Sequence, residues 1–472
     1  MTIRGMSGRY RVAIVAVILA VTAQPASAAP EPALRWRDCG ADTQCAVLTV
    51  PVDWADPAGP VTGVDVVRVP SKDPARGTGT VVANLGAGNS TAAIVGPRSA
   101  PIQSWLDQLT ERSDVVVFDP RGLGREDRQT VCPRPPAPIL GLVRRQDDAA
   151  WTTHARENAA YDAGCRQAAG PAFAGLDSWQ IAHDLDALRA ALGEKKLRYF
   201  GNSYGTTYGQ AYAELFGARL DRMYLDGVAD HTRPRLIDWL ADHARAQELQ
   251  LLRFRDWCAS KPSCALHGED AAKAWDDLLS ASAVTGDLFA GALVGMNPPR
   301  WPDLARAIAK ARAGDDSDFR TVLDYPPTGP TGSVQAATLC HDFMPVLPDH
   351  ASFLEIERRL KAVAPRFGWI EGRYEVGRCL GIPGEPAYPP HPLSASGTPP
   401  VLVTIGELDN NTGHLGAAHV ARQFPRARSV RHGDGHAAYL LGNACLRALG
   451  NAYLLDGVLP PDGTFCPAEL AP

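Results

Sequence analysis

Several features that would indicate whole classes of protein are scarce or missing in this chain. Basic residues are in no excess, because 47 Lys and Arg stand against 52 Asp and Glu, for a formal net charge of -5 at pH 7. A mildly acidic chain has no electrostatic case for binding nucleic acid. The sequence contains neither a Cys-x-x-Cys nor a His-Glu-x-x-His pattern, so there is little reason to expect a metal site. We expect no metal, no cofactor and no nucleic-acid partner.

Long apolar runs are also rare. The main one, VAIVAVILAVTA at residues 12–23, is too short to span the roughly 30 Å of hydrocarbon in a bilayer. Arginines precede it and the small residues Ala26-Ser27-Ala28 follow it, which is the three-part pattern of a secretory signal peptide. We therefore expect residues 1–28 to be a signal peptide and the mature chain to begin near Ala29. The mature protein is expected to be secreted to the extracellular space, with no membrane association.

Ten cysteines follow this segment. An even number of cysteines in an exported chain implies disulfides. The sequence order suggests that neighbours pair, although order alone does not fix the connectivity. The suggested pairs are Cys39 with Cys45, Cys132 with Cys165, Cys258 with Cys264, Cys340 with Cys379, and Cys445 with Cys466.

The remaining composition is that of a large globular protein. Of 472 residues, 45% are hydrophobic and 21% are charged, which provides material for a large core. Short apolar runs alternate with helical patterns, and this alternation favours a parallel sheet covered by helices, an α/β fold. The strand-like runs are residues 80–85, 115–118, 197–200, 222–225, 400–405 and 427–431.

One of these strands runs directly into a helix through Gly201-Asn202-Ser203-Tyr204-Gly205. A turn that sharp puts Ser203 in strained backbone geometry, and the flanking glycines remove side chains that would collide. The hydroxyl is then exposed beside the amides and the positive dipole end of a helix, where a developing oxyanion is stabilised. The pattern predicts a nucleophilic serine; the alternative is a chance match in a chain with 44 glycines.

A serine nucleophile needs a base, and the base needs an orienting acid. On this type of sheet the chain order is Ser, then acid, then His. The loop in VLVTIGELDNNTGH offers Asp409, and the loop in SVRHGDGHAAY offers His436. We predict that Ser203, Asp409 and His436 form a catalytic triad.

Other charged residues are weaker candidates. Asp226, at the end of the strand RMYLD, is an alternative acid, and Glu407 is a weaker one. His432 stands at a strand end, where we expect it to support the structure. In FDPRGLGRED, Asp119 and Arg121 are expected to fix their loop by a salt bridge and to have no chemical role.

A second oxyanion donor is expected in the loop of VVANLGAGNS, after an early strand. Its glycines allow the backbone to approach a substrate, although a plain glycine turn is the alternative. We favour the N–H of Gly86, or of Ala87, acting together with the N–H of Tyr204. One such donor is typically worth roughly 3 kcal/mol in the transition state.

Between residues 229 and 399 the alternation of strands and helices is lost. Helical stretches, such as WPDLARAIAKARAGDD, are joined by segments rich in proline and glycine. We expect a mainly helical cap inserted at 229–399, with residues 29–228 and 400–472 forming the two parts of the core. A cap would cover the serine and select what reaches it; the alternative is a separate helical domain.

An ordered set of segments extends over most of the chain: VVANLGAGNS, FDPRGLG, DLDALRAALG, GNSYGTTYG, LDGV, WCASKPSC, ATLCHDF, IGELDNNT and GDGH. In this order they resemble the secreted tripeptidyl aminopeptidase family of α/β-hydrolases, relatives of proline iminopeptidases. The resemblance runs from about residue 35 to the C-terminus. It implies an α/β-hydrolase fold and a serine exopeptidase that releases short peptides, tripeptides by analogy, from free N-termini, with Ser203, Asp409 and His436 as its triad. We expect peptide substrates and a monomer.

An exopeptidase also needs a group that holds the ammonium of its substrate, and a cap carboxylate such as Asp238, Asp242 or Glu248 would serve. The chain departs from the family in the oxyanion loop, where Leu85-Gly86-Ala87-Gly88 replaces the usual Gly-Gly-Pro-Gly. This change puts substrate preference and efficiency in question more than reaction class. Two alternative functions remain open: a secreted esterase or lipase with the same triad, and a non-catalytic binding protein of the same fold.

Overall fold

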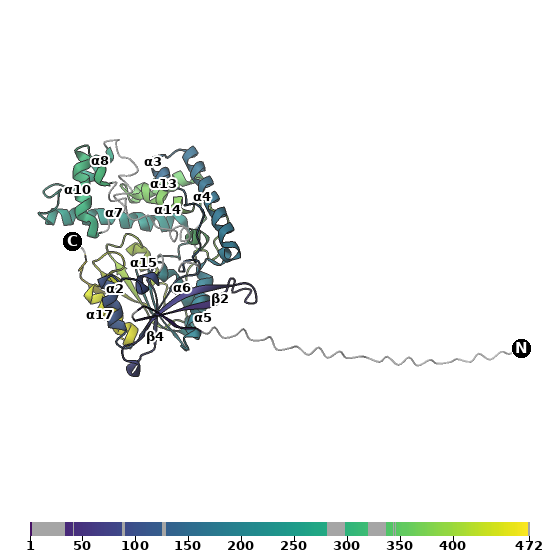
Figure 1. The fold of residues 1–472 in the computed structure, drawn as a ribbon. Coiled ribbons are helices and arrows are strands. Elements are labelled where there is room, and N and C mark those ends of the chain that lie inside the picture. The colour runs from purple at the N-terminus through teal and green to yellow at the C-terminus, as the bar shows by residue number, and fades with distance from the viewer. Residues whose placement is uncertain are drawn as a thin grey trace. The chain divides into compact units, whose positions relative to one another are not determined.

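A single sheet of ten strands organises the described part of the chain (Figure 1). Its spatial order is β1-β2-β3-β5-β4-β6-β7-β8-β9-β10. The strands are β1 (Arg37–Gly40), β2 (Thr43–Pro51), β3 (Val61–Val69), β4 (Thr80–Asn84), β5 (Asp114–Phe118), β6 (Leu197–Asn202), β7 (Leu220–Asp226), β8 (Val401–Gly406), β9 (Arg428–His432) and β10 (Thr464–Cys466).

The structure, a computed structural model, describes residues 1, 34–40, 42–86, 90–124, 129–280, 298–319, 337–342, 344 and 346–470. Apart from Met1, the expected signal peptide at 1–28 lies outside these residues, and so does Ala87. Residues 32–472 make up one structural unit. No described helix is long and apolar enough to cross a membrane.

The strand directions determine where a site can form. The strands from β1 to β3, and β3 with β5, pair antiparallel, whereas all pairs from β5–β4 to β9–β10 are parallel. After β4 the chain adds β5 on one side and then returns to add β6 on the other side. Such a switch in strand order leaves a crevice at the carboxyl ends of the strands, and Ser203 follows β6 directly at that edge.

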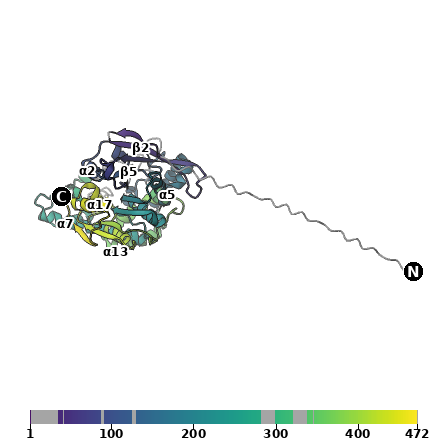
Figure 2. The same ribbon diagram turned by 90° about the horizontal axis from the view of Figure 1, so that it is seen from below.

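Helices cover both faces of the sheet (Figures 1 and 2). On one face α5, α6 and α15 pack against residues such as Val82 and Val116, and on the other face α2, α16 and α17 pack against their neighbours Val81 and Val115. The alternation along each strand explains why β4 and β5 are apolar throughout. The helices of this part of the fold, including the short α1, are α1 (Ala92–Val95), α2 (Ala100–Leu109), α5 (Ser178–Ala191), α6 (Tyr204–Phe216), α15 (His414–Ala421), α16 (Ala438–Leu441) and α17 (Ala444–Asp456).

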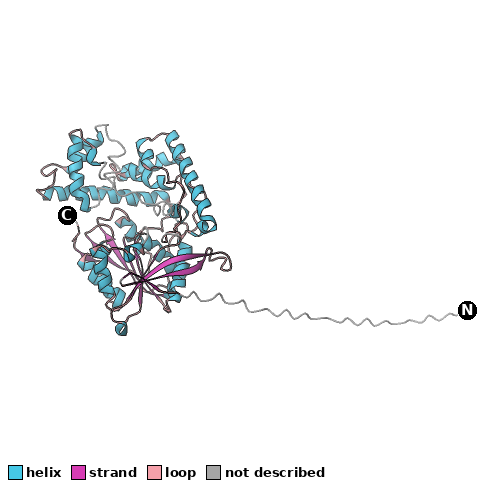
Figure 3. Cartoon of the chain, viewed as in Figure 1, coloured by secondary structure: helices cyan, strands magenta, loops and turns pink. Residues whose placement is uncertain are grey.

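A second group of helices, which we call the roof, has its own apolar cores (Figure 3). Most of the roof comes from the predicted insertion, but α3 and α4 precede β6 in the chain. The side chains of His154 and Asn158 on α4 contact the carbonyl of Gly377 at 2.7 and 2.9 Å. The roof helices are α3 (Leu140–Arg144), α4 (Asp148–Ala169), α7 (Leu236–Ser260), α8 (Ala271–Ser280), α10 (Trp301–Arg312), α13 (His350–Val363) and α14 (Gly368–Cys379).

Short 3₁₀ turns complete the described secondary structure: η1 (Pro74–Arg76), η3 (Gly170–Gly175), η4 (Gly217–Arg219) and η5 (Pro298–Arg300). The predicted cysteine pairs are confirmed. The disulfides join Cys39 to Cys45, Cys132 to Cys165, Cys258 to Cys264, Cys340 to Cys379, and Cys445 to Cys466.

The expected salt bridge between Asp119 and Arg121 is wrong. Arg121 instead pairs with the buried carboxylate of Asp184 on α5, with the Nε–Oδ2 distance at 2.7 Å. Asp119 accepts hydrogen bonds from the amide and the hydroxyl of Thr91, at 2.9 and 2.6 Å. Each of the two groups therefore anchors the loop to a different helix.

Candidate active site

The turn around Ser203 has the strained geometry that the sequence predicts. Ser203 has φ 52° and ψ -121°, a region that non-glycine residues rarely adopt. A Cβ added at Gly201 would lie 2.5 Å from the carbonyl oxygen of Gly205, and one added at Gly205 would lie 2.7 Å from the carbonyl oxygen of Asn84. The hydroxyl of Tyr199 donates to the Gly205 carbonyl at 2.7 Å. Only glycine fits at both flanking positions, so the turn stays tight.

Two backbone amides were expected to line this turn. Tyr204 is the first residue of α6, and the first amides of a helix have no partner within the helix. The N–H of Gly86 donates to Oδ1 of Asn84 at 3.1 Å, so it is already engaged. Gly86 is nonetheless close to the nucleophile turn, because a Cβ added there would lie 3.0 Å from Cβ of Ser203.

Asp409 and His436 are hydrogen-bonded to each other. Nδ1 of His436 lies 3.0 Å from Oδ2 and 3.2 Å from Oδ1 of Asp409. Asp409 also accepts from the amides of Asn411 and Thr412, both at 2.9 Å, and from the Thr412 hydroxyl at 2.7 Å. The carboxylate therefore has all the donors it needs to stay ionised in a buried position.

The pKa values of this pair move apart. Burial alone would raise the pKa of Asp409, but the charge and hydrogen bond of His436 and the donors of Thr412 hold it well below its ordinary value. Burial alone would lower the pKa of His436, but the charge and hydrogen bond of Asp409 raise it above its ordinary value. Since Nδ1 faces Asp409, Nε2 is the nitrogen that remains for proton transfer.

The strand ends bring this pair close to the nucleophile turn. The amide of Ser203 donates to the carbonyl of Asp226 at 3.1 Å, and the next residue, Gly227, lies against the base: a Cβ there would be 2.7 Å from Cε1 of His436. Asn202 contacts the loop after β4 and also lies close to Gly227. Its amide group donates to the carbonyl of Leu85 at 3.1 Å, and its Oδ1 is 3.5 Å from the position of a Cβ added at Gly227.

The alternative candidates have other partners. Oδ1 of Asp226 accepts from the Thr404 hydroxyl. Glu407 is partly exposed and pairs with Arg431 at 2.8 Å. His432 is buried at the end of β9 and packs beside Gly406, where a Cβ would lie 2.8 Å from its Cε1. The acid that orients His436 in the structure is therefore Asp409.

The three suggested ammonium-binding acids are already paired with arginines. Asp238 pairs with Arg235 at 2.6 Å, Asp242 with Arg233 at 2.5 Å, and Glu248 with Arg366 at 2.6 Å.

Sequence reasoning missed a different group in the roof, formed by His243 on α7 and by Glu371 and Glu375 on α14. Their ligand-type atoms lie within 4.8 Å of one another, and Nδ1 of His243 is 3.6 Å from Oε1 of Glu371. Both glutamates are buried. Burial raises the pKa of Glu371, a rise that the hydrogen bond and charge of His243 reduce. We call these three residues the acidic roof cluster.

The acidic roof cluster is near the nucleophile turn. Tyr204, next to Ser203, packs against the roof core. Burial raises the pKa of Tyr204, and the charges of Arg378 and Glu375 act on it as well. One turn along α7 from His243, the side-chain amide of Gln247 donates to the carbonyl of Asn410 at 3.2 Å, in the loop that carries Asp409. The spacing of Glu371 and Glu375, one turn apart on α14, was the available signal in the sequence.

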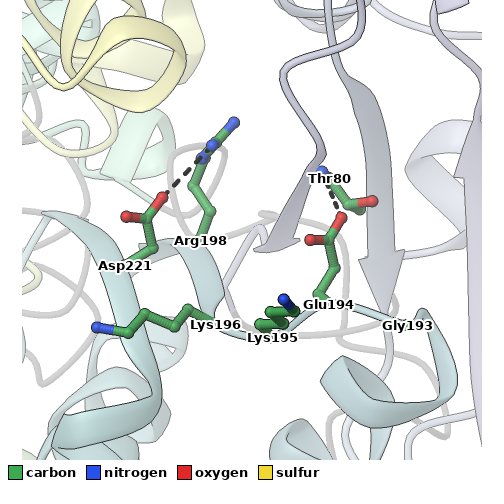
Figure 4. A pocket seen from close by; sticks show the side chains of 7 residues that line it. All are labelled: Thr80, Gly193, Glu194, Lys195, Lys196, Arg198 and Asp221. Atoms are coloured by element: carbon green, nitrogen blue, oxygen red, sulfur yellow. Dashed lines mark hydrogen bonds and ion pairs between the residues drawn. The ribbon is translucent and has the colours of Figure 1, made fainter.

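A hollow of about 370 Å³ lies elsewhere, at the start of β4, β6 and β7 (Figure 4). Its lining residues are Thr80, Gly193, Glu194, Lys195, Lys196, Arg198 and Asp221. In parallel strands the start is the edge opposite the carboxyl ends, and no residue of the predicted triad lines this hollow. We assign it no part in the chemistry.

The chain is similar to several known proteins. The family model described as TAP-like protein matches residues 368–466. Serine protease Hip1 of Mycobacterium tuberculosis is 28% identical, and the match covers 89% of this chain and 87% of that protein. The tripeptidyl aminopeptidase of Streptomyces coelicolor is 27% identical over 95% of this chain and 88% of its own length. Carboxylesterase B of M. tuberculosis is 29% identical over 94% and 91%.

Strand order, the strained serine turn and these relatives define an α/β-hydrolase of the serine hydrolase class. Within that class, the matches confirm the resemblance to the secreted tripeptidyl aminopeptidase family, and they make the chain a serine hydrolase of the peptidase type.

Proposed function

We propose that this protein is an exported serine exopeptidase that releases short peptides, tripeptides by analogy, from free N-termini. The observation that supports it most is the hydrogen bond between the buried carboxylate of Asp409 and the imidazole of His436, beside the strained turn of Ser203. A base oriented by an acid next to a partly exposed serine is the arrangement that acyl transfer requires. The mature protein would be a monomer that begins near Ala29.

In the proposed mechanism the Oγ of Ser203 attacks the scissile carbonyl, and Nε2 of His436 takes its proton. Asp409 holds the imidazolium through Nδ1. The N–H of Tyr204 and a loop amide bind the oxyanion. For Gly86 to be that loop amide, its N–H must leave Oδ1 of Asn84 or be shared with it. His436 then protonates the leaving amine, and water releases the acyl group by the same steps.

The acidic roof cluster is our candidate for the ammonium subsite. An N-terminal ammonium needs a carboxylate that no arginine holds closely. Glu371 meets this condition better than Asp238, Asp242 or Glu248, because it pairs with the His243 imidazole at 3.6 Å. Glu375 shares its charge with Arg378 at 3.2 Å. One carboxylate for the ammonium therefore lies within the described roof, beside the nucleophile turn.

An esterase is the second candidate function. Its support is specific, since carboxylesterase B is as similar to this chain as the peptidases are. The triad serves both reactions, because ester and amide hydrolysis pass through the same kind of tetrahedral intermediate. The two proposals differ in what the acidic roof cluster would contribute, because an ester substrate brings no ammonium to it.

The deciding experiment measures hydrolysis of three substrates: a free tripeptide-coumarin amide, its N-acetylated counterpart and a short-chain nitrophenyl ester. It compares the mature protein with Ser203→Ala and with Ser352→Ala, which changes an exposed serine on α13. We expect cleavage of the free amide only, lost by about 10⁴-fold or more in Ser203→Ala and unchanged in Ser352→Ala.

Other outcomes would redirect the proposal. Ester turnover without amide cleavage would make the protein an esterase, and turnover that survives Ser203→Ala would reject the triad. Mass measurement of the exported protein and its elution in size-exclusion chromatography would test the cleavage near Ala29 and the monomer.

A further inference from the structure

Asp226 is a buried carboxylate that the proposed mechanism does not use. It is the last residue of β7, between β6, which leads to Ser203, and β8, which leads to Asp409. Its side chain is fully buried. A buried acid is costly unless its oxygens are hydrogen-bonded, so its partners indicate why it is there.

The contacts of Asp226 reach both the nucleophile and the base. Its carbonyl accepts the amide of Ser203 at 3.1 Å. Its Oδ1 accepts from the Thr404 hydroxyl at 2.5 Å, and its Oδ2 accepts from the amide of Tyr439 at 3.3 Å. Tyr439 is the second residue of α16, the short helix that begins two residues after His436.

The last of these contacts replaces a missing helix cap. At the start of a helix, a side-chain oxygen of the preceding residue normally accepts one of the first amides. Here that position is Ala437, which has no such oxygen and adopts φ 60° and ψ 31°, a left-handed conformation. Asp226 supplies the acceptor from a different strand. Ala437 directly follows His436, so this contact holds the segment that carries the base.

The residue after Asp226 makes room for the base. Gly227 has φ 60°, and a Cβ there would lie 2.7 Å from Cε1 and 2.9 Å from Nδ1 of His436. The strand end at Asp226 and Gly227 thus forms the surface against which the imidazole lies.

We propose that Asp226 is a positioning residue for the reaction: through its carbonyl and its Oδ2 it fixes the nucleophile turn and the His436 segment relative to each other. The proposal rests on the proposed function of Ser203 and His436. It adds a role that neither the triad nor the oxyanion donors include, because Asp226 acts through Tyr439 and Ser203 and does not touch the substrate.

The charge of Asp226 gives the role a measurable signature. Burial raises the pKa of Asp226, while nearby His432 and His436 lower it, and the Asp226 carboxylate in turn contributes to the raised pKa of His436. The titratable groups that face Asp226 from the surrounding elements are Tyr224 on β7, Asp409 after β8, His432 on β9, His436 before α16 and Tyr439 on α16. The charge of Arg447 on α17 acts on Tyr224 and Tyr439.

The test uses Asp226→Asn and Asp226→Ala in the mature enzyme, with kcat and KM measured against pH. Asn keeps an acceptor for the Tyr439 amide but removes the charge, so we expect kcat within about fivefold of wild type and an acid limb shifted down by about half a pH unit. Ala removes both, and we expect kcat to fall about 100-fold with little change in KM, since misplacement of a catalytic group has that cost.

A matched control is Asp119→Asn. Asp119 is also buried at the carboxyl end of a strand, β5, and also accepts an amide and a hydroxyl, both from Thr91. We expect this variant to leave the acid limb where it is. A wild-type enzyme with no Ser203-dependent turnover would reject the proposed function itself.

The positioning role has its own contrary outcome. Wild-type turnover that depends on Ser203, together with an unshifted acid limb in Asp226→Asn and an unchanged kcat in Asp226→Ala, would reject that role alone. If Asp226→Ala does not fold, the isosteric Asn variant still decides through its pH profile, because a merely structural role would not move that limb.

Discussion

The nucleophile turn and the roof are built by different kinds of contact. In the turn, backbone atoms approach so closely that Gly201 and Gly205 have no space for a Cβ. In the roof, side chains of separate helices meet, as His243 of α7 meets Glu371 of α14. The turn therefore tolerates no added atom at these two positions, whereas the acidic roof cluster is formed by contacts between side chains. If Ser203, Asp409 and His436 carry the chemistry as proposed, the comparison predicts that changes in the core affect every substrate and that changes in the acidic roof cluster affect only substrates with an ammonium.

Asp409→Asn should have the largest effect and should act on every substrate. An amide in place of the acid favours the wrong tautomer of His436, and we expect kcat/KM to fall by about 10⁴-fold. Hydrolysis of the free tripeptide amide and of any ester that the enzyme accepts would be measured side by side. The matched control is Glu407→Gln in the same loop, expected to stay within about threefold. A loss of activity toward only one of the substrates would contradict the assignment of the chemistry to the core and of substrate selection to the roof.

Gly205→Ala tests the core side through packing alone. The new Cβ would lie 2.7 Å from the carbonyl oxygen of Asn84, and we expect a loss of about 2 to 3 kcal/mol in the free energy of unfolding and about 100-fold in kcat. Urea unfolding and steady-state kinetics would measure both. Gly141→Ala on α3, where an added Cβ meets nothing within 4 Å, should be neutral or slightly stabilising. Equal effects in the two variants would contradict the packing explanation.

The two regions also differ in how well they could be predicted. Ser203, Asp409 and His436 were predictable as candidates because each stands in a loop or turn after a predicted strand. The strands β4, β5 and β8 are apolar and buried enough to be recognised. The strands β1 to β3 were missed because polar residues interrupt them, as in RDCG and VTGVDVVRV. No local pattern indicated that α4, which precedes β6, would join the roof.

The acidic roof cluster could not be predicted for a physical reason. The sequence offered Asp238, Asp242 and Glu248 as equals of any other acid, and only the folded chain shows that arginines hold all three. A carboxylate becomes a candidate binding group when no arginine holds it closely, and that depends on the helix it faces. Asp226 was considered as the acid of the triad because it stands at a strand end. The sequence did not show the hydrogen-bond partners that it has in the fold.

Glu371→Gln tests the roof side and should affect one class of substrate. If Glu371 binds the substrate ammonium, its loss removes a charged hydrogen bond worth about 2 kcal/mol, and we expect kcat/KM for the free tripeptide amide to fall about 30-fold. Turnover of a substrate without an ammonium should change little, which separates this variant from Asp409→Asn. Glu248→Gln, an acid of the same roof that Arg366 holds, is the control. A similar loss in both variants would reject the subsite.

The smallest expected effect is the position of the acid limb in the pH profile of kcat/KM. A general base must be neutral to accept a proton, and Asp409 raises the pKa of His436 above its ordinary value of 6.5 despite burial. Activity should therefore fall as the pH drops through a value above 6.5. The same shift has a consequence for stability: a raised folded-state pKa contributes stability below the unfolded value near 6.5 and loses it as the pH rises through the folded value.

Asp409 has the opposite sign. Its pKa is lowered in the folded protein, so its contribution to stability is present above the unfolded value of about 3.9 and is lost as the pH falls. Thr412→Val removes a hydroxyl that donates to Asp409 at 2.7 Å, so the pKa of Asp409 in the folded protein should be lowered less than in the wild type. Thermal unfolding measured between pH 3 and pH 8 should then show a smaller loss of stability on acidification. An acid limb of kcat/KM below pH 6 in the wild type would contradict this argument, because it would show that the charge of Asp409 does not dominate the pKa of His436.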